Sequence, residues 1–408
     1  MKILFLTMLS SIANIYERGI YTDLMRKFLD EGHEVYIMYP NERRLGKATE
    51  VSTRGMAHSL GVRTLNVTKT NIIEKGIGQL LLGSQFKRAF KKYFGSEKFD
   101  VILYSTPPIT FNGVVEYAKK ISGGKAMTYL LLKDIFPQNA VDMGMLSKTG
   151  AKRVLYNMFR QREKRLYQIS DFIGCMSPAN VQYLLKHNPQ VGTDKVEIAP
   201  NSVDLSPCNV LQEEERSAIL KKYKLPTDKP IFIYGGNLGI PQGIPFLIDC
   251  LEANANRKDC HFVIVGSGTY YQRLADWYKN HKPAAVTVMK GLPKADYDKL
   301  VRACNVGLIF LDYRFTIPNY PSRLLSYLEY KMPIIACTDK NCDTGTIAEK
   351  NGFGLYAPSN DVKAFTYAVD KMLKADIKTM GERGYEFLKA NYLVEHTYNA
   401  IMKHVVAE

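Results

Sequence analysis

Short apolar runs alternate with helical patterns along most of this 408-residue chain. The first run, KILFLTML, precedes a segment in which Ile20, Leu24, Phe28 and Leu29 fall on one helical face, and the run VYIMYP follows. Strand, helix and strand in this order are typical of a parallel sheet whose faces are covered by helices. The alternation therefore predicts an α/β fold.

The same alternation begins again at residue 230, which indicates a second domain of the same kind. A length of 408 residues agrees with two domains of about 200 residues each. Segment 201–212 is polar and has no periodicity, so we expect the linker there. The predicted domains are residues 1–204 and 205–385, both doubly wound parallel sheets of the Rossmann type, with a helical tail at 386–408 that crosses back onto the first domain. The expected strands are 2–9, 35–40, 101–105, 126–134, 171–177 and 196–201 in the first domain, and 230–239, 261–268, 286–291, 306–313, 332–339 and 352–358 in the second.

Composition narrows the class of protein. No run of about 20 apolar residues occurs, so no transmembrane helix is expected. The start, MKILFLTMLSSIA, has an apolar run like that of a signal peptide, but it carries one Lys only and a helical pattern follows, which favours a buried strand. Seven cysteines without a CxxC spacing, and histidines without an HExxH motif, argue against a disulfide framework and a zinc site and fit a reducing cytoplasm.

The net charge of +15 is unevenly distributed. Residues 1–204 hold 29 Lys and Arg against 18 Asp and Glu, whereas the remainder holds 26 against 22. The first half is therefore expected to meet an anionic surface or ligand, and both nucleic acid and anionic lipid fit this charge.

Two glycine-bearing strand ends in the second half suggest a phosphate site. GGNLGIPQG (235–243) follows an expected strand and precedes a helix, so its backbone N–H groups can approach a phosphate closely. It is neither GxGxxG nor a Walker A motif, and a tight turn without a ligand is the alternative. VGSG (265–268) ends the next strand, at the edge where open α/β sheets bind ligands. The candidate residues are Gly236, Asn237, Gly239, Gln242 and Gly266.

The stretch PSRLLSYLEY places Ser322 and Arg323 at an expected helix start, where an anion is favourable. Arg323 can donate several hydrogen bonds to a phosphate in a fixed geometry. Alternatively, Ser322 only caps the helix and Arg323 is solvated. The two glycine-bearing loops in the same half favour phosphate binding.

LLLKDIFPQNA (130–140) ends a strand with Lys133 and Asp134, which face the crevice of a two-domain enzyme. Asp134 is a candidate catalytic or sugar-binding carboxylate, and a helix cap is the alternative. DYD (296–298) has the letters of the metal-binding DxD motif, but residues two apart point to different faces of a helix, so no metal site is predicted.

Residues 71–95 mix apolar and basic positions in a helical pattern. They predict an interfacial helix that docks on a membrane, with an ordinary amphipathic helix packed on its own domain, or a single-stranded nucleic-acid surface, as alternatives. The expected basic residues are Lys87, Arg88, Lys91 and Lys92, and the expected apolar surface comprises Ile73, Ile77, Leu80, Leu81, Phe86, Phe90 and Phe94.

Taken in order, KILFLT, ERGIYTDLMRKFLDEGHEV, KDIFPQNAVDMGML, IAPNSVD, GNLGIPQGI, FVIVGSG and PSRLLSYLEYKMPIIA resemble the glycosyltransferases of the GT-B fold in sequence-based family 4, over nearly the whole chain. Within this family the chain resembles the bacterial transferases that add N-acetyl-L-fucosamine (FucNAc) during O-antigen or capsule synthesis. The resemblance implies retaining transfer from a nucleotide sugar, UDP-linked, in a cleft between two Rossmann-like domains. It implies neither a metal nor another cofactor. The first domain would bind the acceptor and the second the nucleotide sugar.

The resemblance also assigns residues. The loop Gly236–Gly239 and Arg323 would stabilise the diphosphate, helped by Lys290 and Lys294, with Leu292 beside them. Gly19 matches the glycine-bearing first loop near the sugar and the acceptor.

The chain departs from the family pattern at several positions. Pro318 and Ser326 stand where relatives carry two glutamates, so either Ser326 replaces the ribose-binding carboxylate or Glu329 acts from a shifted position. Asn237 and Gln242 stand where many relatives carry Arg and Lys.

The expected function is transfer of an amino sugar onto a lipid-diphosphate-linked saccharide by an enzyme held peripherally at the inner face of the cell membrane. Its expected partners are the nucleotide sugar, the lipid-linked acceptor and an anionic membrane surface, without nucleic acid. A nucleotide-sugar 2-epimerase of the same fold and a non-catalytic basic protein that binds membrane or nucleic acid are the alternatives.

Overall fold

The computed structural model describes residues 1–68, 70, 72–205 and 211–405. The chain divides into two units, the first formed by Met1–Asp204 with Tyr392–Glu408 and the second by Leu205–Asn391. The expected linker, 201–212, falls in part outside the described residues.

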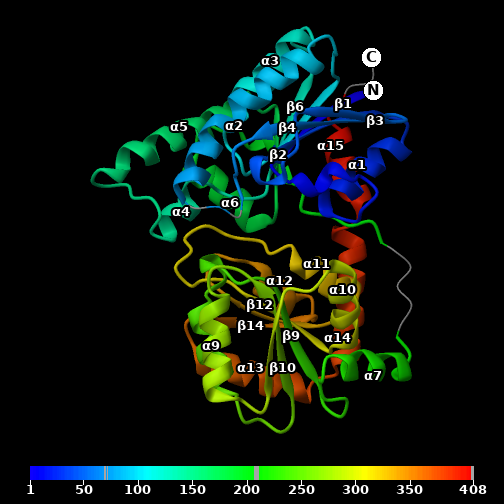
Figure 1. The fold of residues 1–408 in the computed structure, drawn as a ribbon, viewed down its shortest axis with the longest axis vertical. Coiled ribbons are helices and arrows are strands. Elements are labelled where there is room, and N and C mark those ends of the chain that lie inside the picture. The colour runs from blue at the N-terminus through cyan, green and yellow to red at the C-terminus, as the bar shows by residue number, and fades with distance from the viewer. Residues whose placement is uncertain (69, 71, 206–210, 406–408) are drawn as a thin grey trace. The chain divides into compact units, whose positions relative to one another are not determined.

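The first unit is built on an eight-stranded sheet with the order β3-β4-β2-β1-β5-β6-β7-β8 (Figure 1). Its strands are β1 (Lys2–Leu6), β2 (Glu34–Glu42), β3 (Glu50–Arg54), β4 (Ala57–Thr64), β5 (Val101–Ser105), β6 (Met127–Leu132), β7 (Phe172–Cys175) and β8 (Val196–Ile198). All neighbouring strands are parallel except β3, which pairs antiparallel with β4. The hairpin β3–β4 was not predicted, because its residues lack a long apolar run and β3 is exposed throughout.

Helices cover both faces of this sheet. They are α1 (Ile20–Asp30), α2 (Ile72–Tyr93), α3 (Asn112–Ile121), α4 (Gln138–Asp142), α5 (Lys152–Ile169), α6 (Pro178–His187) and α15 (Val394–Met402). The central strand β1 shows why two layers form. Its side chains alternate, so that Ile3 and Phe5 enter one buried cluster with α1 and α15, while Leu4 and Leu6 enter another with α2 and α3.

The second unit contains a six-stranded, all-parallel sheet with the order β11-β10-β9-β12-β13-β14. Its strands are β9 (Ile231–Asn237), β10 (His261–Ser267), β11 (Val286–Lys290), β12 (Val306–Phe310), β13 (Ile334–Thr338) and β14 (Gly354–Pro358). Its helices are α7 (Glu213–Lys222), α8 (Ile244–Ala253), α9 (Tyr271–His281), α10 (Lys294–Ala303), α11 (Arg323–Glu329), α12 (Thr344–Lys350), α13 (Val362–Lys374) and α14 (Ile377–Asn391).

The chain returns to the first unit at Tyr392, between α14 and α15. In Figure 1 α15, drawn in red, lies beside α1, drawn in blue. The Tyr398 ring meets the Phe28 ring edge-on with 5.1 Å between the centroids, and its hydroxyl lies 2.9 Å from Nε2 of His33. The last helix of the sequence thus completes the core of the first unit.

Candidate functional site

Three strand ends of the second unit bring glycines and a lysine side by side. The register pairs Gly236 of β9 with Gly266 of β10, and Gly266 with Lys290 of β11. A methyl group added at Gly266 would lie 2.2 Å from the carbonyl oxygen of Gly236. Only glycine fits there, and the backbone at this carboxyl edge stays open to a close-approaching ligand.

Arg323, the first residue of α11, reaches the same edge. Its guanidinium lies 4.3 Å above the centre of the Tyr234 ring, and Nη2 lies 3.0 Å from the point where a Cβ of Gly236 would stand. Nη1 is shielded from solvent and has no hydrogen-bond partner among the described side chains and backbone. Burial opposes the charge, but the phenol groups of Tyr234, Tyr327 and Tyr297 outweigh it and raise the pKa of Arg323. A permanent cation with an unused donor therefore adjoins the glycine edge, which is the arrangement an anion requires.

Asn237 and Gln242 bind each other in the loop after β9. Nδ2 of Asn237 donates to Oε1 of Gln242 at 2.8 Å, and the N–H of Gly239 donates to the same oxygen at 3.2 Å. Tyr234 adds a hydrogen bond from its hydroxyl to the carbonyl oxygen of Asn237 at 2.7 Å. These contacts fix the shape of the loop, so the side chains of Asn237 and Gln242 have a structural role in it.

The remaining candidates of the second unit, Ser322, Ser326 and Glu329, lie at different positions along helix α11. Ser322 is the exposed N-cap residue and makes no side-chain cap hydrogen bond, while Ser326 lies one turn after Arg323. Glu329 lies at the other end of the helix, where it lines a cavity of about 770 Å³ with Pro230 and Asn305, which precede β9 and β12. That cavity is at the amino edge of the sheet. The geometry therefore argues against Glu329 as a shifted ribose ligand, because α11 carries it away from the glycine edge.

The two lysines proposed as helpers differ. Lys290 is exposed at the end of β11, and Leu292 is half-buried just after it. Lys294 begins α10 and forms an ion pair with Asp298 at 2.9 Å. Lys290 is thus the helper that the strand register brings to Gly266.

Lys133 and Asp134 follow β6 at the carboxyl edge of the first sheet. Nζ of Lys133 donates to the carbonyl oxygen of Ala199 at 2.7 Å, and burial lowers the pKa of Lys133 to about 7. Burial raises the pKa of Asp134 to about 6, although Nδ2 of Asn139 donates to its carboxylate at 3.0 Å. Asp134 does not cap α4, whose N-cap residue is Pro137. Burial thus shifts the pKa values of both groups toward neutral, a property that is common in functional sites.

Gly19 is the residue before α1, and a buried carboxylate holds it in place. Its N–H donates to Oδ1 of Asp23 at 2.9 Å, and the N–H of Asp204 donates to Oδ2 at 3.1 Å. Arg26 forms an ion pair with Asp23 at 2.5 Å. This network keeps the first loop of the unit in a defined shape.

The apolar part of the predicted membrane helix is not on the surface. Phe86, Phe90 and Phe94 of α2 and the turn after it are buried in the core of the first unit, so this part of the prediction is wrong and the packed amphipathic helix is correct. Only Ile77 and Leu81 are largely exposed, while Leu80 is partly buried. The side chain of Ile73 lies outside the described part of the structure. Of the basic residues, Lys87 is half-buried, and Arg88, Lys91 and Lys92 are exposed.

Sequence reasoning missed the aromatic support of Arg323. Tyr234 lies inside the apolar run IFIYGG, which reads as plain strand, and Tyr297 lies inside the rejected DYD motif. A methyl group at Gly235 would lie 1.8 Å from the Tyr297 hydroxyl. A tyrosine just before a glycine pair at a strand end is the signal that was available.

Two searches of the described residues were negative. No group of three or more His, Cys, Asp or Glu side chains among them is arranged to hold a metal ion. None of the helices described is both long and apolar enough to span a membrane.

Comparison with known proteins relates part of the chain to a family. Residues 215–387 match the model of the glycosyl transferases group 1 family. The probable glycosyltransferase WbjE of Pseudomonas aeruginosa is 24% identical over 328 residues, which cover 79% of this chain and 78% of WbjE.

Solved structures share the architecture at low identity. Sucrose-phosphate synthase of Thermosynechococcus elongatus has a TM-score of 0.74 at 15% identity, covering 99% of this chain and 98% of its own. HepE of Anabaena in complex with UDP has a TM-score of 0.66 at 13% identity, covering 99% of both chains. These neighbours have the GT-B fold. The match to a glycosyl transferase model over residues 215–387 does not favour the epimerase and non-catalytic alternatives. Residues 215–387 thus resemble the glycosyl transferases of group 1, and the chain has the two parallel sheets of the GT-B fold.

Proposed function

We propose that this enzyme transfers an N-acetylated deoxy-amino sugar such as FucNAc from a UDP-sugar to a lipid-diphosphate-linked saccharide, with retention of configuration and without a metal. It works on surface polysaccharide at the inner face of the cell membrane. The observation that carries the proposal is the pairing of the Arg323 guanidinium with the glycine edge at Gly236.

The chemistry of the leaving group explains why this pairing matters. Cleavage of a nucleotide sugar leaves negative charge on the diphosphate, and fixed donors aimed at that charge lower the barrier. Arg323, held by Tyr234, supplies the cation, and the loop that begins at Gly236 supplies backbone N–H groups. The exposed Lys290 adds a second positive charge next to Gly266. In the proposed reaction these groups do what a divalent cation does in metal-dependent transferases.

The first unit is assigned to the acceptor. Its excess of basic residues suits a lipid diphosphate, and burial shifts the pKa values of Lys133 and Asp134 toward neutral. The first loop, with Gly19 fixed by Asp23, would lie near the transferred sugar. In this scheme Asp134 is the candidate carboxylate for a sugar hydroxyl.

The choice of UDP is supported by HepE, whose structures hold UDP and, in one case, UDP with glucose. The choice of an N-acetylated deoxy-amino sugar rests on the sequence resemblance described above.

The first test is calorimetric titration of the whole chain with UDP, GDP, dTDP and CMP, with and without EDTA. We expect one clear preference, for UDP, that EDTA does not change. Arg323→Ala should weaken UDP binding on the order of 100-fold, because a half-buried cation with a solvent-shielded donor is lost. Arg383→Ala, an exposed arginine on α14, is the matched control and should bind as the wild type does. Equal UDP affinity in the two variants would remove Arg323 from the site, and absence of binding to all four nucleotides would refute the proposed donor.

A further inference from the structure

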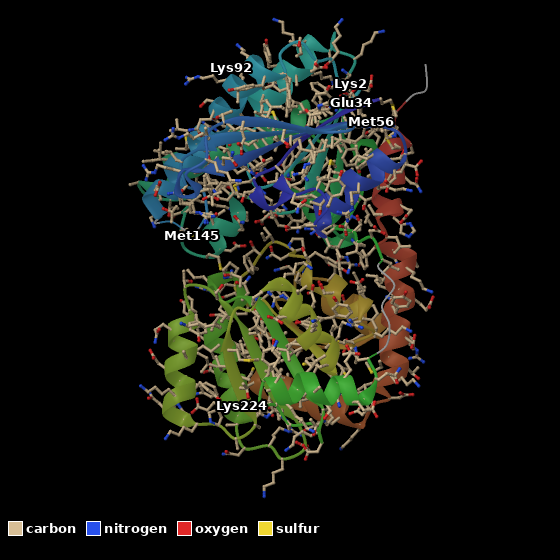
Figure 2. The ribbon with its side chains drawn as sticks, turned by 45° about the vertical axis from the view of Figure 1, so that its right-hand side comes forward. Lys2, Glu34, Met56, Lys92, Met145 and Lys224 are labelled. Carbon is tan, nitrogen blue, oxygen red and sulfur yellow. The ribbon has the colours of Figure 1, made fainter. Side chains whose placement is uncertain are left out.

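The start of α5 and the loop before it expose several large apolar side chains. Val154 is 77% exposed, Met145 is 49% exposed and Leu155 is 40% exposed. In Figure 1 the first turns of α5 project from the body of the first unit, and Figure 2 shows Met145 at the edge of that unit. Single exposed apolar residues are common, but three within eleven positions on a projecting segment indicate a contact surface.

The same segment is strongly basic. Residues 143–162 contain five Lys and Arg and no Asp or Glu. Lys148, Lys152 and Arg153 are exposed, and the last two belong to the first turn of α5, which has no acidic residue. The positive end of the helix dipole makes cations unfavourable in that turn.

The start of α5 therefore combines two locally destabilising features. Apolar side chains are exposed to water, and cations lie at the N-terminus of a helix. Such coincidences are expected where function requires them. Helix α2 provides the contrast, because its aromatic side chains Phe86 and Phe90 are buried against its own sheet. Lys92, near the end of α2, and Met145 lie far apart on the first unit (Figure 2).

We propose that the segment Met145–Leu155 docks this enzyme onto an anionic phospholipid surface. This inference rests on the proposed function, since a lipid-linked acceptor is reached at a membrane. Met145, Val154 and Leu155 enter the boundary between headgroups and acyl chains, while Lys148, Lys152 and Arg153 pair with anionic headgroups. Aliphatic side chains suit acyl chains, whereas single-stranded nucleic acid is bound by stacking on exposed aromatic rings.

The test is flotation of the full chain with vesicles of phosphatidylcholine alone or mixed with phosphatidylglycerol. The wild type should bind the mixed vesicles only. Reversal of Lys148, Lys152 and Arg153 to Glu should weaken that binding on the order of 100-fold, because each cation at an anionic surface contributes about a factor of five. Val154→Ser with Leu155→Ser should weaken it roughly tenfold while keeping the charge.

Two controls make the result specific. Reversal of Lys363, Lys371 and Lys374 on α13, all exposed, changes the net charge equally and should leave binding within about twofold. Charge reversal to Glu at Lys87, Arg88, Lys91 and Lys92 tests whether the basic surface of α2 contributes to vesicle binding. The inference would be overturned if the α2 or α13 variant lost vesicle binding while the α5 variant retained it. It would also be overturned if the wild type did not bind the mixed vesicles.

UDP titration of every variant separates this inference from the proposed function. Intact UDP binding in an α5 variant that no longer floats supports the docking surface. Intact UDP binding in an α5 variant that floats normally overturns the docking surface and leaves the donor site standing.

Discussion

Gly236 has a backbone φ of +128°, a conformation that residues with a side chain rarely adopt. A Cβ there would also lie 3.0 Å from Nη2 of Arg323. We therefore expect Gly236→Ala to weaken UDP binding at least tenfold, by shifting both the loop and the guanidinium. Gly291→Ala is the control, because its Cβ would meet atoms at ordinary distances of 3.8–3.9 Å. Titration calorimetry gives both affinities, and equal values would show that the diphosphate does not approach Gly236.

Lys133 predicts a pH effect whose sign follows from its pKa. The pKa is lowered from 10.5 to about 7 by burial, so between pH 7 and 10.5 the unfolded chain binds more protons than the folded one. Stability contributed by this group therefore rises with pH over that range. Relative to Lys133→Met, the wild type should gain on the order of 1–3 kcal/mol in free energy of unfolding from pH 7 to 10. Urea titrations at both pH values measure this difference, and a constant gap between the two proteins would contradict the lowered pKa.

At the scale of elements, α2 packs through glycine. A methyl group on Gly83 would lie 1.9 Å from the carbonyl oxygen of Thr110, whereas one on Gly76, in the same helix, would meet no atom within 4 Å. Gly83→Ala should therefore destabilise the protein by about 2–3 kcal/mol. Gly76→Ala should stabilise it by about 0.5–1 kcal/mol, since alanine favours a helix. Denaturant midpoints give both values. Destabilisation by both variants would contradict the prediction that the helix propensity of alanine determines the effect at Gly76.

How far the elements could be predicted depended on their burial. Strands such as β5 and β12 are buried on both faces and appear in the sequence as continuous apolar runs. The exposed edge strand β3 has no such run, and it was missed. The apolar pattern of α2 was recognised, but periodicity alone does not say whether an apolar face meets a sheet or a membrane. The core of the first unit decided that question.

The candidate site also has parts that the sequence predicts and parts that it does not. Glycines at strand ends, and an arginine at a helix start, are local signals, and the structure brings Gly236, Gly266 and Arg323 to one edge. The support from Tyr234 and Tyr297 depends on contacts between elements, and the tyrosine before the glycine pair at 235–236 was its one local signal in the sequence. Glu329 was considered by distance along the chain, but seven residues of helix carry it from one edge of the sheet to the other.

At the scale of the whole molecule, the chain closes its first unit with its last helix. Val394 and Ile401 of α15 are buried in the cluster that contains Phe5 and Phe28. Thr397 donates to the carbonyl oxygen of Pro200 at 3.2 Å. Leu388, thirteen residues before Ile401, is buried in the second unit. The neighbouring helices α14 and α15 thus belong to different units, so a substitution in each tests the stability of a different unit.

This division makes a thermal prediction. Ile401→Ala leaves a cavity in the first unit and Leu388→Ala leaves one in the second, each costing about 2–5 kcal/mol. Scanning calorimetry should resolve two transitions, with each variant lowering a different one. Because Arg323 and the glycine edge both belong to the second unit, UDP should raise the transition that Leu388→Ala lowers, by mass action on the folded form. If UDP instead raised only the transition that Ile401→Ala lowers, the diphosphate site would lie in the first unit, and Arg323 would need another role.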